Sequence, residues 1–482
     1  MKKLLLVALL VSAFVGARAQ RMMGVANANW GGTLGMYLNP ASIVDNRAVL
    51  SLDFASLNFA VDNNLASLNL NQAFGAATGV NGTGKLLTFN GNDKFNVLLP
   101  VTELRGPGFM FSLDSMSAFA ISTRLRGFNQ FSSFDRTLFR TIMDPNFNEA
   151  SGYSFKSGNF NWTGHMWTEL NVTYGRVFHR HYKHFVKAAV TAGFMMGIGF
   201  ISVHGKNLDA TYYNNDSLVA TNTDIRFASS VISKTGELGN GLDDVSLLGK
   251  NAGYGFRADI GGVYEYRPEN FDPVDFTTNK YKVRGSIALT DLGFMRYGNA
   301  GRADITGNGS MSTGDLARNA ANYTDLTKYG NARGFTLDTS RKAAKVGIPT
   351  ALVLGADYYI VNDLYVNLTW IANLANRNKP GNSYYNQVTV TPRVELKYFT
   401  FAIPVTYSGM TKGFKAGMGM RLGWVYFGSD DMLLLVSKKQ YGVNFYVGGY
   451  IPLNFTYSGY RVEGKNPEAP ATRKEMEGVP MY

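Results

Sequence analysis

The sequence predicts an all-β protein, a transmembrane antiparallel β-barrel of about fourteen strands. Three observations lead to this fold class: an export signal opens the chain, alternating apolar and polar residues recur along the mature chain, and the polar positions often carry charge. A soluble β-sandwich would also alternate, so alternation alone does not separate the two architectures. Export, long strands and a charged second face together favour a barrel with lipid outside and water inside.

Residues 1–19 are expected to be a secretory signal peptide. Two lysines precede an apolar run over residues 4–15, and Ala17 and Ala19 supply the small residues of a cleavage site. The chain contains no cysteine, so disulfides and thiolate metal sites are excluded.

The mature chain is basic. The three basic residues of the signal peptide leave 44 of the 47 lysines and arginines against 35 acidic residues, an excess of +9. For an exported protein, we expect outer-membrane lipids and lipopolysaccharide phosphates to be the partners of this charge, and no nucleic acid. The alternative is a lumen and rim rich in solvated lysine and arginine.

A short helical turn is expected before the first strand. Asn39 suits a helix cap and Pro40 suits the first helical position, so Asn39, Pro40 and Ala41 are expected to open one turn. The alternative is that these residues only turn the chain into the first strand.

The first strand begins near residue 48 and changes face along its length. Apolar residues occupy even positions from 50 to 54 and odd positions from 57 to 61. An extra residue is needed for such a change, so a bulge is expected near Ala55 and Ser56.

The later strands show the period of two most clearly. Tyr254, Phe256 and Ile260 alternate with Arg257 and Asp259. Charged residues at such positions are expected to face the lumen: Arg124, Arg126, Arg257, Asp259, Arg284, Arg393, Glu395, Lys397 and Arg421. They would form ladders of opposite charge that fill space, or, alternatively, a field that selects anionic head groups such as carboxylates.

Loop lengths predict which end of the barrel faces the periplasm. The links at residues 114–117, 178–184, 360–363 and near 398 are short, whereas those after residues 61, 128, 204 and 292 are long. Outer-membrane barrels keep short turns on the periplasmic side, so the C-terminus is expected there. The barrel is expected to span residues 48–455, with 432–437 as its weakest strand, and residues 456–482 to form a flexible periplasmic tail.

The long loop expected after residue 292 contains a candidate calcium site. Asp304, Thr306, Asn308, Ser312 and Asp315 fall at the positions of a calcium loop, where oxygens converge on a hard cation. The alternative is an ordinary polar loop tip. No other cofactor is expected, and no serine, histidine and acid pattern indicates an enzyme.

The stretches "GGTLGMYLNPASIVDNR", "IPTALVLGADYYI" and "GSDDMLLLVSKKQYGVNFYVGGYIPL" carry a resemblance over most of the mature chain. It resembles an uncharacterised family of outer-membrane barrels of the Bacteroidota, related to FadL-type fatty-acid transporters and secretion-associated barrels. The resemblance implies that residues 20–47, with Asn39, Pro40 and Ala41, form a plug or hatch inside the barrel.

For function, the resemblance implies passive passage of a small hydrophobic or amphipathic molecule across the outer membrane. The alternative is a non-conducting scaffold or accessory subunit of a secretion-type complex, with protein partners. A transporter should have an apolar pocket beside the plug, whereas a scaffold should have a lumen closed by side chains.

Overall fold

The computed structural model describes residues 21–68, 87–89, 94–136, 152–181, 183–213, 217–231, 253–268, 281–312, 323–377, 379–432 and 441–453. The expected signal peptide and C-terminal tail lie outside the described residues, as do positions 433–437 of the weakest expected strand. No helix in the described ranges is both long enough and apolar enough to cross a membrane.

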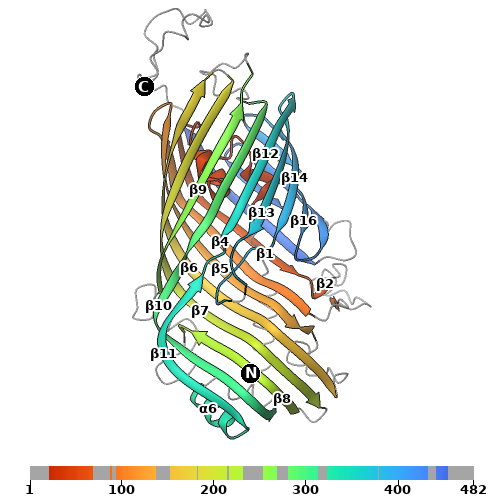
Figure 1. Ribbon diagram of the computed structural model, residues 1–482. Helices are drawn as coiled ribbons and strands as arrows, with labels where there is room; N and C mark the ends of the chain where they lie inside the picture. The colour runs from red at the N-terminus through yellow and green to blue at the C-terminus, as the bar shows by residue number, and fades with distance from the viewer. Residues whose placement is uncertain are drawn as a thin grey trace, which may run out of the picture.

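The strands form an antiparallel sheet that closes into a ring (Figure 1). Among the described residues, the ring has fourteen strand positions: β1 (Leu50–Asn63), β4 (Lys94–Ser112), β5 (Ser117–Asp135), β6 (Tyr153–His181), β7 (His184–Tyr213), β9 (Gly253–Tyr266), β10 (Val283–Ser312), β12 (Ala351–Val361), β13 (Leu364–Asn373), β14 (Gln387–Glu395), β15 with β16 (Phe399–Ala402, Val405–Ser408), β17 with β18 (Gly413–Ala416, Met418–Leu422), β19 (Val425–Ser429) and β20 (Gly442–Leu453). β20 pairs with β1, and this closes the barrel. The predicted strand number is confirmed.

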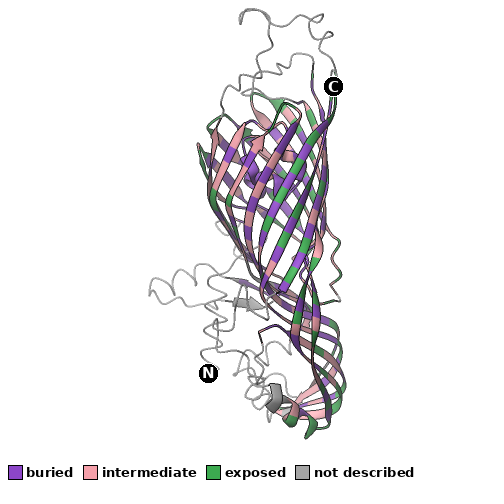
Figure 2. Cartoon of the chain, turned by 90° about the vertical axis from the view of Figure 1, so that its left-hand side faces the viewer, coloured by how far each residue is buried: buried purple, intermediate pink, exposed green. Residues whose placement is uncertain are grey.

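Side chains alternate between the outside and the lumen, as the sequence predicts. In β9, Phe256 is 71% exposed and Arg257 is 4% exposed, and Figure 2 shows the same alternation of exposed and buried residues along the strands. Tyr254 and Tyr264, both exposed, stand about ten residues apart, which at about 3.3 Å per residue and a tilt of about 40° gives a height of about 25 Å. This is the height of the apolar band of a transmembrane barrel.

The predicted short turns and the predicted bulge are confirmed. β4 and β5, β6 and β7, β12 and β13, and β14 and β15 are joined by short turns at the end of the barrel where β20 ends, the top of Figure 1. The register of β1 against β20 shifts between Asp53 and Ala55, which is the bulge. A second small sheet pairs β2 (Ala66–Leu68) with β3 (Leu87–Phe89).

The prediction of long loops after residues 128, 204 and 292 is partly wrong. β6, β7 and β10 continue past the ring and pair with β8 (Ser217–Ser229) and β11 (Phe335–Gly347) in an outer sheet, at the bottom of Figure 1. The helix α6 (Tyr323–Asn331) contacts β11. The period of two is short here, as at Leu218 and Ala220 of β8 or Phe335 and Leu337 of β11, and polar residues follow it, so the sequence does not mark these segments as strands as clearly as those of the barrel.

Residues 21–48, which we call the inner segment, lie inside the ring. They form α2 (Met23–Ala26) and the 3₁₀ turns η1 (Gly32–Tyr37) and η2 (Pro40–Ile43), and most of their side chains are buried. The predicted cap is confirmed, because the side chain of Asn39 accepts a hydrogen bond from the amide of Ala41 at 2.9 Å.

Residues 374–386, which we call the crossing loop, link β13 to β14 and reach the opposite wall. The side-chain amide of Asn382 donates to the carbonyl of Thr163 in β6 at 3.2 Å, and the amide of Ser383 donates to Gln130 in β5 at 2.9 Å. Because β5 and β6 stand across the ring from β13 and β14, this loop crosses the lumen.

Candidate functional site

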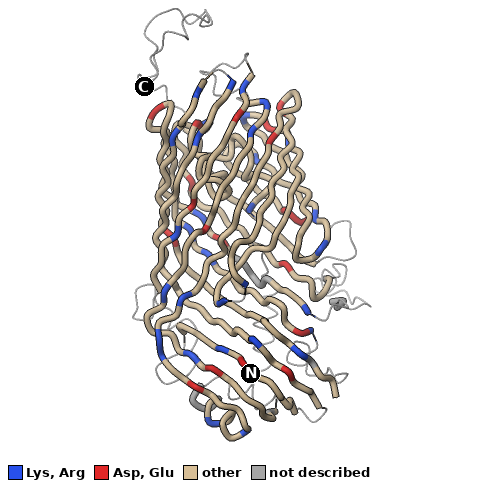
Figure 3. The backbone as a smooth tube through the Cα atoms, in the orientation of Figure 1, with Lys and Arg blue, Asp and Glu red and all other residues tan. Residues whose placement is uncertain are grey.

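A buried ion-pair network occupies the lumen, and we call its three predicted arginines and their four acids the central network; Arg105 of β4 adds a further pair with Glu103 at 3.1 Å. Its members come from β4, β5, β6, β9 and β10: Glu103, Arg124, Arg126, Glu169, Arg257, Asp259 and Asp291. Nitrogens of Arg124 lie 2.7 Å from an oxygen of Glu169 and 3.0 Å from one of Glu103. Figure 3 shows both signs of charge distributed over the barrel strands. The network ties these five strands together through charge pairs that satisfy one another.

Asp291 is the residue on which the three arginines converge. Its carboxylate accepts hydrogen bonds from Arg126 at 2.9 Å, Arg257 at 2.8 Å and Arg124 at 3.2 Å. Arg257 also lies 2.8 Å from Asp259. Three of the predicted lumen arginines therefore share one acid that sequence reasoning missed.

Asp291 was missed because a bulge turns it inward. Strict alternation with the lumen residue Thr290 would put Asp291 on the lipid side. Its φ is 57°, however, and the register of β10 against β9 shifts between Leu289 and Leu292. Aspartate is one of the few residue types that tolerate this left-handed backbone conformation. An aspartate inside a strand was therefore the sequence signal for a bulge at this position.

A second buried network, which we call the cavity network, holds the inner segment. Arg393 lies 2.7 Å from Asp357 and 3.0 Å from Glu395, and Arg284 lies 2.9 Å from Asp357. The hydroxyl of Tyr281 donates to Asp357. The charged residues of this network lie in β10, β12 and β14, and Tyr281 lies two positions before the start of β10.

The inner segment bonds directly to the cavity network. The amide of Trp30 donates to Glu395 at 2.9 Å, and the side chain of Asn29 donates to the same carboxylate at 3.1 Å. Arg284 donates to the carbonyl of Asn27 at 3.1 Å. Two of the predicted lumen charges, Arg284 and Glu395, therefore touch the inner segment.

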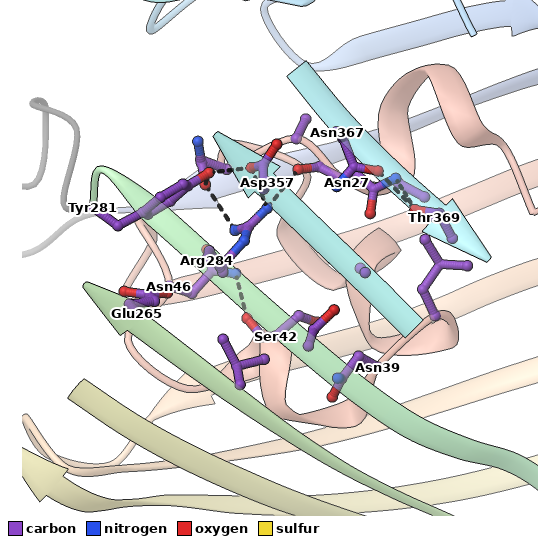
Figure 4. Close-up of a pocket in the computed structure, with 18 of the residues that line it drawn as sticks. Asn27, Asn39, Ser42, Asn46, Glu265, Tyr281, Arg284, Asp357, Asn367 and Thr369 are labelled. Carbon is purple, nitrogen blue, oxygen red and sulfur yellow. Dashed lines mark hydrogen bonds and ion pairs between the residues drawn. The ribbon is translucent and has the colours of Figure 1, made fainter. Parts of the chain in front are cut away.

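A cavity of about 90 Å³ lies between the inner segment and the wall beside the cavity network (Figure 4). Its polar lining comes from both sides: Asn27, Asn29, Asn39, Ser42, Asp45, Asn46, Arg47, Lys187, Glu265, Tyr281, Arg284, Ser286, Asp357, Asn367 and Thr369. Opposite charges here are paired, as in Arg284 with Asp357, and amides bond to neighbours, as Asn39 does to Gly262, whereas the hydroxyl of Ser42 has no hydrogen-bond partner among the described residues. Such a lining suits a neutral hydrogen-bonding group.

The predicted residues Asn39, Pro40 and Ala41 stand at the wall. The side-chain amide of Asn39 donates to the carbonyls of Gly262 and Ile287, both at 3.0 Å. The structure thus places this turn against β9 and β10, where a side chain at Gly261 would collide with Asn39. Their role as a hatch stays a prediction.

The remaining predicted lumen charges differ in their places. The guanidinium of Arg421 is buried and donates to the carbonyls of Leu396, Lys397 and Gly423 at the short-turn end. Lys397 was wrongly predicted to face the lumen. β14 ends at Glu395, so Lys397 lies in the following turn and is exposed, because the alternation does not continue past the strand.

The prediction of a loop around the candidate calcium site is wrong over the described residues, because Asp304, Thr306, Asn308 and Ser312 lie in the strand β10. Asp304 and Thr306 pair with both β8 and β11, Asn308 lies at a register shift against β8, and Ser312 pairs with β8. Asp315 lies outside the described residues. An extended strand rises about 3.3 Å per residue, which spreads these oxygens instead of gathering them around an ion. Calcium binding stays a prediction that this geometry does not support.

The inner segment and the crossing loop meet at the central network. The guanidinium of Arg21 lies 4.7 Å from the ring centroid of Tyr384, and the hydroxyl of Tyr384 accepts a hydrogen bond from Arg126 at 2.6 Å. Arg21 also lies 4.0 Å from Asp291. The lumen is therefore occupied from both ends, with charged side chains between.

The fold and these contacts define a closed antiparallel barrel of the transmembrane type, with its own N-terminal segment inside the lumen. The chain belongs to the family of unknown function DUF5723, which matches residues 40–430. No curated protein matches the chain.

Solved structures similar to the chain include three transporter barrels. The toluene transporter TodX of Pseudomonas putida is 9% identical, with a TM-score of 0.44, over 92% of this chain and 99% of TodX. The toluene transporter TbuX of Ralstonia pickettii is 11% identical, with a TM-score of 0.41, over 89% and 98%. A Pseudomonas aeruginosa FadL homologue is 10% identical, with a TM-score of 0.38, over 91% and 99%. Likenesses this low say nothing about the ligand of this chain.

Proposed function

We propose that the protein is an outer-membrane barrel through which a small amphipathic molecule passes passively, with the inner segment as a movable closure. The signal peptide expected at the N-terminus and the apolar band of about 25 Å support the outer-membrane placement. Passage is passive and involves no catalytic step.

The observation that carries this proposal is how the inner segment is held. It joins the wall through separate contacts, such as Asn39 to Gly262 and Trp30 to Glu395, and it pairs with no described strand. A cavity lies along the joint. Displacing the segment therefore breaks individual hydrogen bonds and leaves the sheet intact.

The interior favours a cargo with one polar and one apolar end. The cavity is lined by amides, hydroxyls and paired charges, whereas Met23 and Leu38 of the inner segment belong to an apolar cluster with Phe128, Trp167 and Tyr297 of the wall. Polar groups lose free energy in apolar surroundings and apolar groups gain it. A molecule with both ends matches this pair of surfaces better than a pure hydrocarbon does.

The test locks the inner segment to the wall. The hydroxyl of Thr33 in η1 donates to Asp53 in β1, so Thr33→Cys with Asp53→Cys places two thiols at this contact. The chain has no cysteine of its own, so only this pair can form a bridge. In proteoliposomes, entry of a fluorescent sugar carrying a short alkyl chain should stop on oxidation and return on reduction.

A matched control locks the wall alone. The hydroxyls of Thr389 in β14 and Thr406 in β16 lie 2.9 Å apart, so Thr389→Cys with Thr406→Cys should bridge without changing entry. Equal entry through the oxidised and reduced Thr33–Asp53 variant would refute a moving closure. Recovery of the protein in the soluble fraction of lysed cells would refute the membrane placement.

The second candidate is a non-conducting scaffold in an outer-membrane complex. It is favoured by the central network and the crossing loop, which fill the lumen with paired charges. A scaffold should give no probe entry in any variant, including one that lacks residues 22–38, whereas a gated passage should leak in that variant.

A further inference from the structure

Two basic side chains stand together on the outward side of β10 and β11, where these strands leave the barrel for the outer sheet. We call Arg296 and Lys345 the basic row. Arg296 is exposed between the buried side chains of Met295 and Tyr297, so it points out of the barrel. Figure 3 shows Lys and Arg positions gathered on this bend.

The basic row brings like charges together. Arg296 stands directly opposite Lys345 in the register of β10 and β11, a pairing that is unfavourable by itself. In the described part of the chain, neither Arg296 nor Lys345 forms an ion pair with an acid; the nearest acids farther out along the two strands are Asp304 and Asp338, which face each other. An anion bound here would relieve the repulsion.

The basic row starts where the apolar band ends. Phe294, two residues before Arg296, is 44% exposed, and the ammonium of Lys345 lies 3.6 Å from its ring centroid. Tyr254, which marks the edge of the band away from the short turns, pairs with Arg296. The cations therefore sit at the level just outside the hydrocarbon, at the end of the barrel opposite the short turns.

We propose that the basic row binds the phosphates of a phosphorylated glycolipid, lipopolysaccharide, in the outer leaflet. Phosphate matches guanidinium and ammonium groups through charge-assisted hydrogen bonds. In such a lipid, the acyl chains fix the phosphates just above the hydrocarbon, which is the level of Arg296 and Lys345. A membrane-anchored phosphate thus meets both the aromatic side chains and the cations, whereas a free phosphate meets only the cations.

The experiment measures glycolipid binding to the full chain in detergent micelles, with diphosphorylated lipid A as the probe. Arg296→Gln/Lys345→Gln should weaken binding about tenfold, because each cation beside a phosphate contributes several-fold. Dephosphorylated lipid A should bind wild-type protein at least about tenfold more weakly, and excess inorganic phosphate should not displace lipid A. Raising the salt concentration should weaken wild-type binding more than binding to the double variant.

The matched control removes two cations at the short-turn end. Lys282 and Lys397 also lie over tyrosine rings, at 4.8 Å and 5.4 Å, so Lys282→Gln/Lys397→Gln should leave lipid A binding unchanged. An equal loss in this control, full binding by the Arg296→Gln/Lys345→Gln variant, or tight binding of the dephosphorylated lipid would overturn the proposal. Displacement of lipid A by inorganic phosphate would show that Arg296 and Lys345 bind free anions instead. Should the double variant misfold, Lys345→Gln alone should weaken binding about threefold. Because binding is measured without transport, failure of the proposed passage leaves this result interpretable.

Discussion

The central network and the cavity network are both buried clusters of arginines and acids inside one barrel, yet they join different parts of the chain. In the central network, most ion pairs join wall residues to each other, as Arg257 to Asp259, and the inner segment adds only the 4.0 Å contact of Arg21 with Asp291. In the cavity network, the wall makes direct hydrogen bonds to the inner segment, as Glu395 does with Trp30 and Asn29. Similar chemistry therefore mainly braces the wall in one place and holds a separate segment in the other.

The largest expected effect is on the central network. Asp291→Asn removes the charge shared by Arg124, Arg126 and Arg257 while keeping the side chain's shape. Breaking a buried ion pair from one side costs about 3–5 kcal/mol, because the remaining charges stay buried. The free energy of unfolding, measured by urea titration of the heat-modifiable gel shift in micelles, should fall by that amount.

Asp224→Asn is the control for this substitution. Asp224 pairs with Lys206 and Arg226 at a partly exposed site, with distances of 3.6 Å and 3.7 Å. Exposed ion pairs contribute about 0–1 kcal/mol, so the free energy of unfolding of the Asp224→Asn variant should hardly change. If the two variants unfold alike, the central network does not brace the wall.

An intermediate effect is expected in the cavity network. Glu395→Gln weakens the acceptor of Trp30 and Asn29 and leaves Arg393 with one acid, Asp357. Loss of charge-assisted hydrogen bonds should cost about 2 kcal/mol. Hydrogen exchange should accelerate over the inner segment much more than over β4 and β5. Uniform acceleration over the whole barrel would erase the distinction between the two networks.

The smallest effect is expected at the cap of η2. Asn39→Ala removes the cap and the two bonds to Gly262 and Ile287, at a cost of about 1 kcal/mol. Asn46 is the matched control, because its side chain donates to Gly32 and Ser42 within the inner segment. Only Asn39→Ala should increase entry of the fluorescent probe into proteoliposomes. Equal entry through the Asn39→Ala and Asn46→Ala variants would show that the contact of Asn39 with the wall does not keep the passage closed.

The sequence alone predicts the faces of the barrel strands well. Phe256 is exposed and Arg257 and Asp259 are buried, because a period of two combined with charge leaves little choice of side. The cap at Asn39 follows equally from local chemistry, since a side-chain oxygen before a proline needs no distant partner.

What sequence reasoning missed depends on contacts between distant residues. Asp291 enters the lumen only through a bulge, and its arginines lie up to 167 positions away in the chain. The amides of Asn27 and Asn29 line the cavity from a segment with no periodicity. Lys397 was misplaced because the pattern does not show where β14 ends.

The outer sheet and the lumen share the strands β7 and β10, each 30 residues long, which run unbroken from one to the other. β10 carries Asp291 in its first half and pairs with both β8 and β11 in its second. A shift of the outer sheet along β10 would therefore move the backbone that carries Asp291, the acid shared by three arginines at the centre of the barrel.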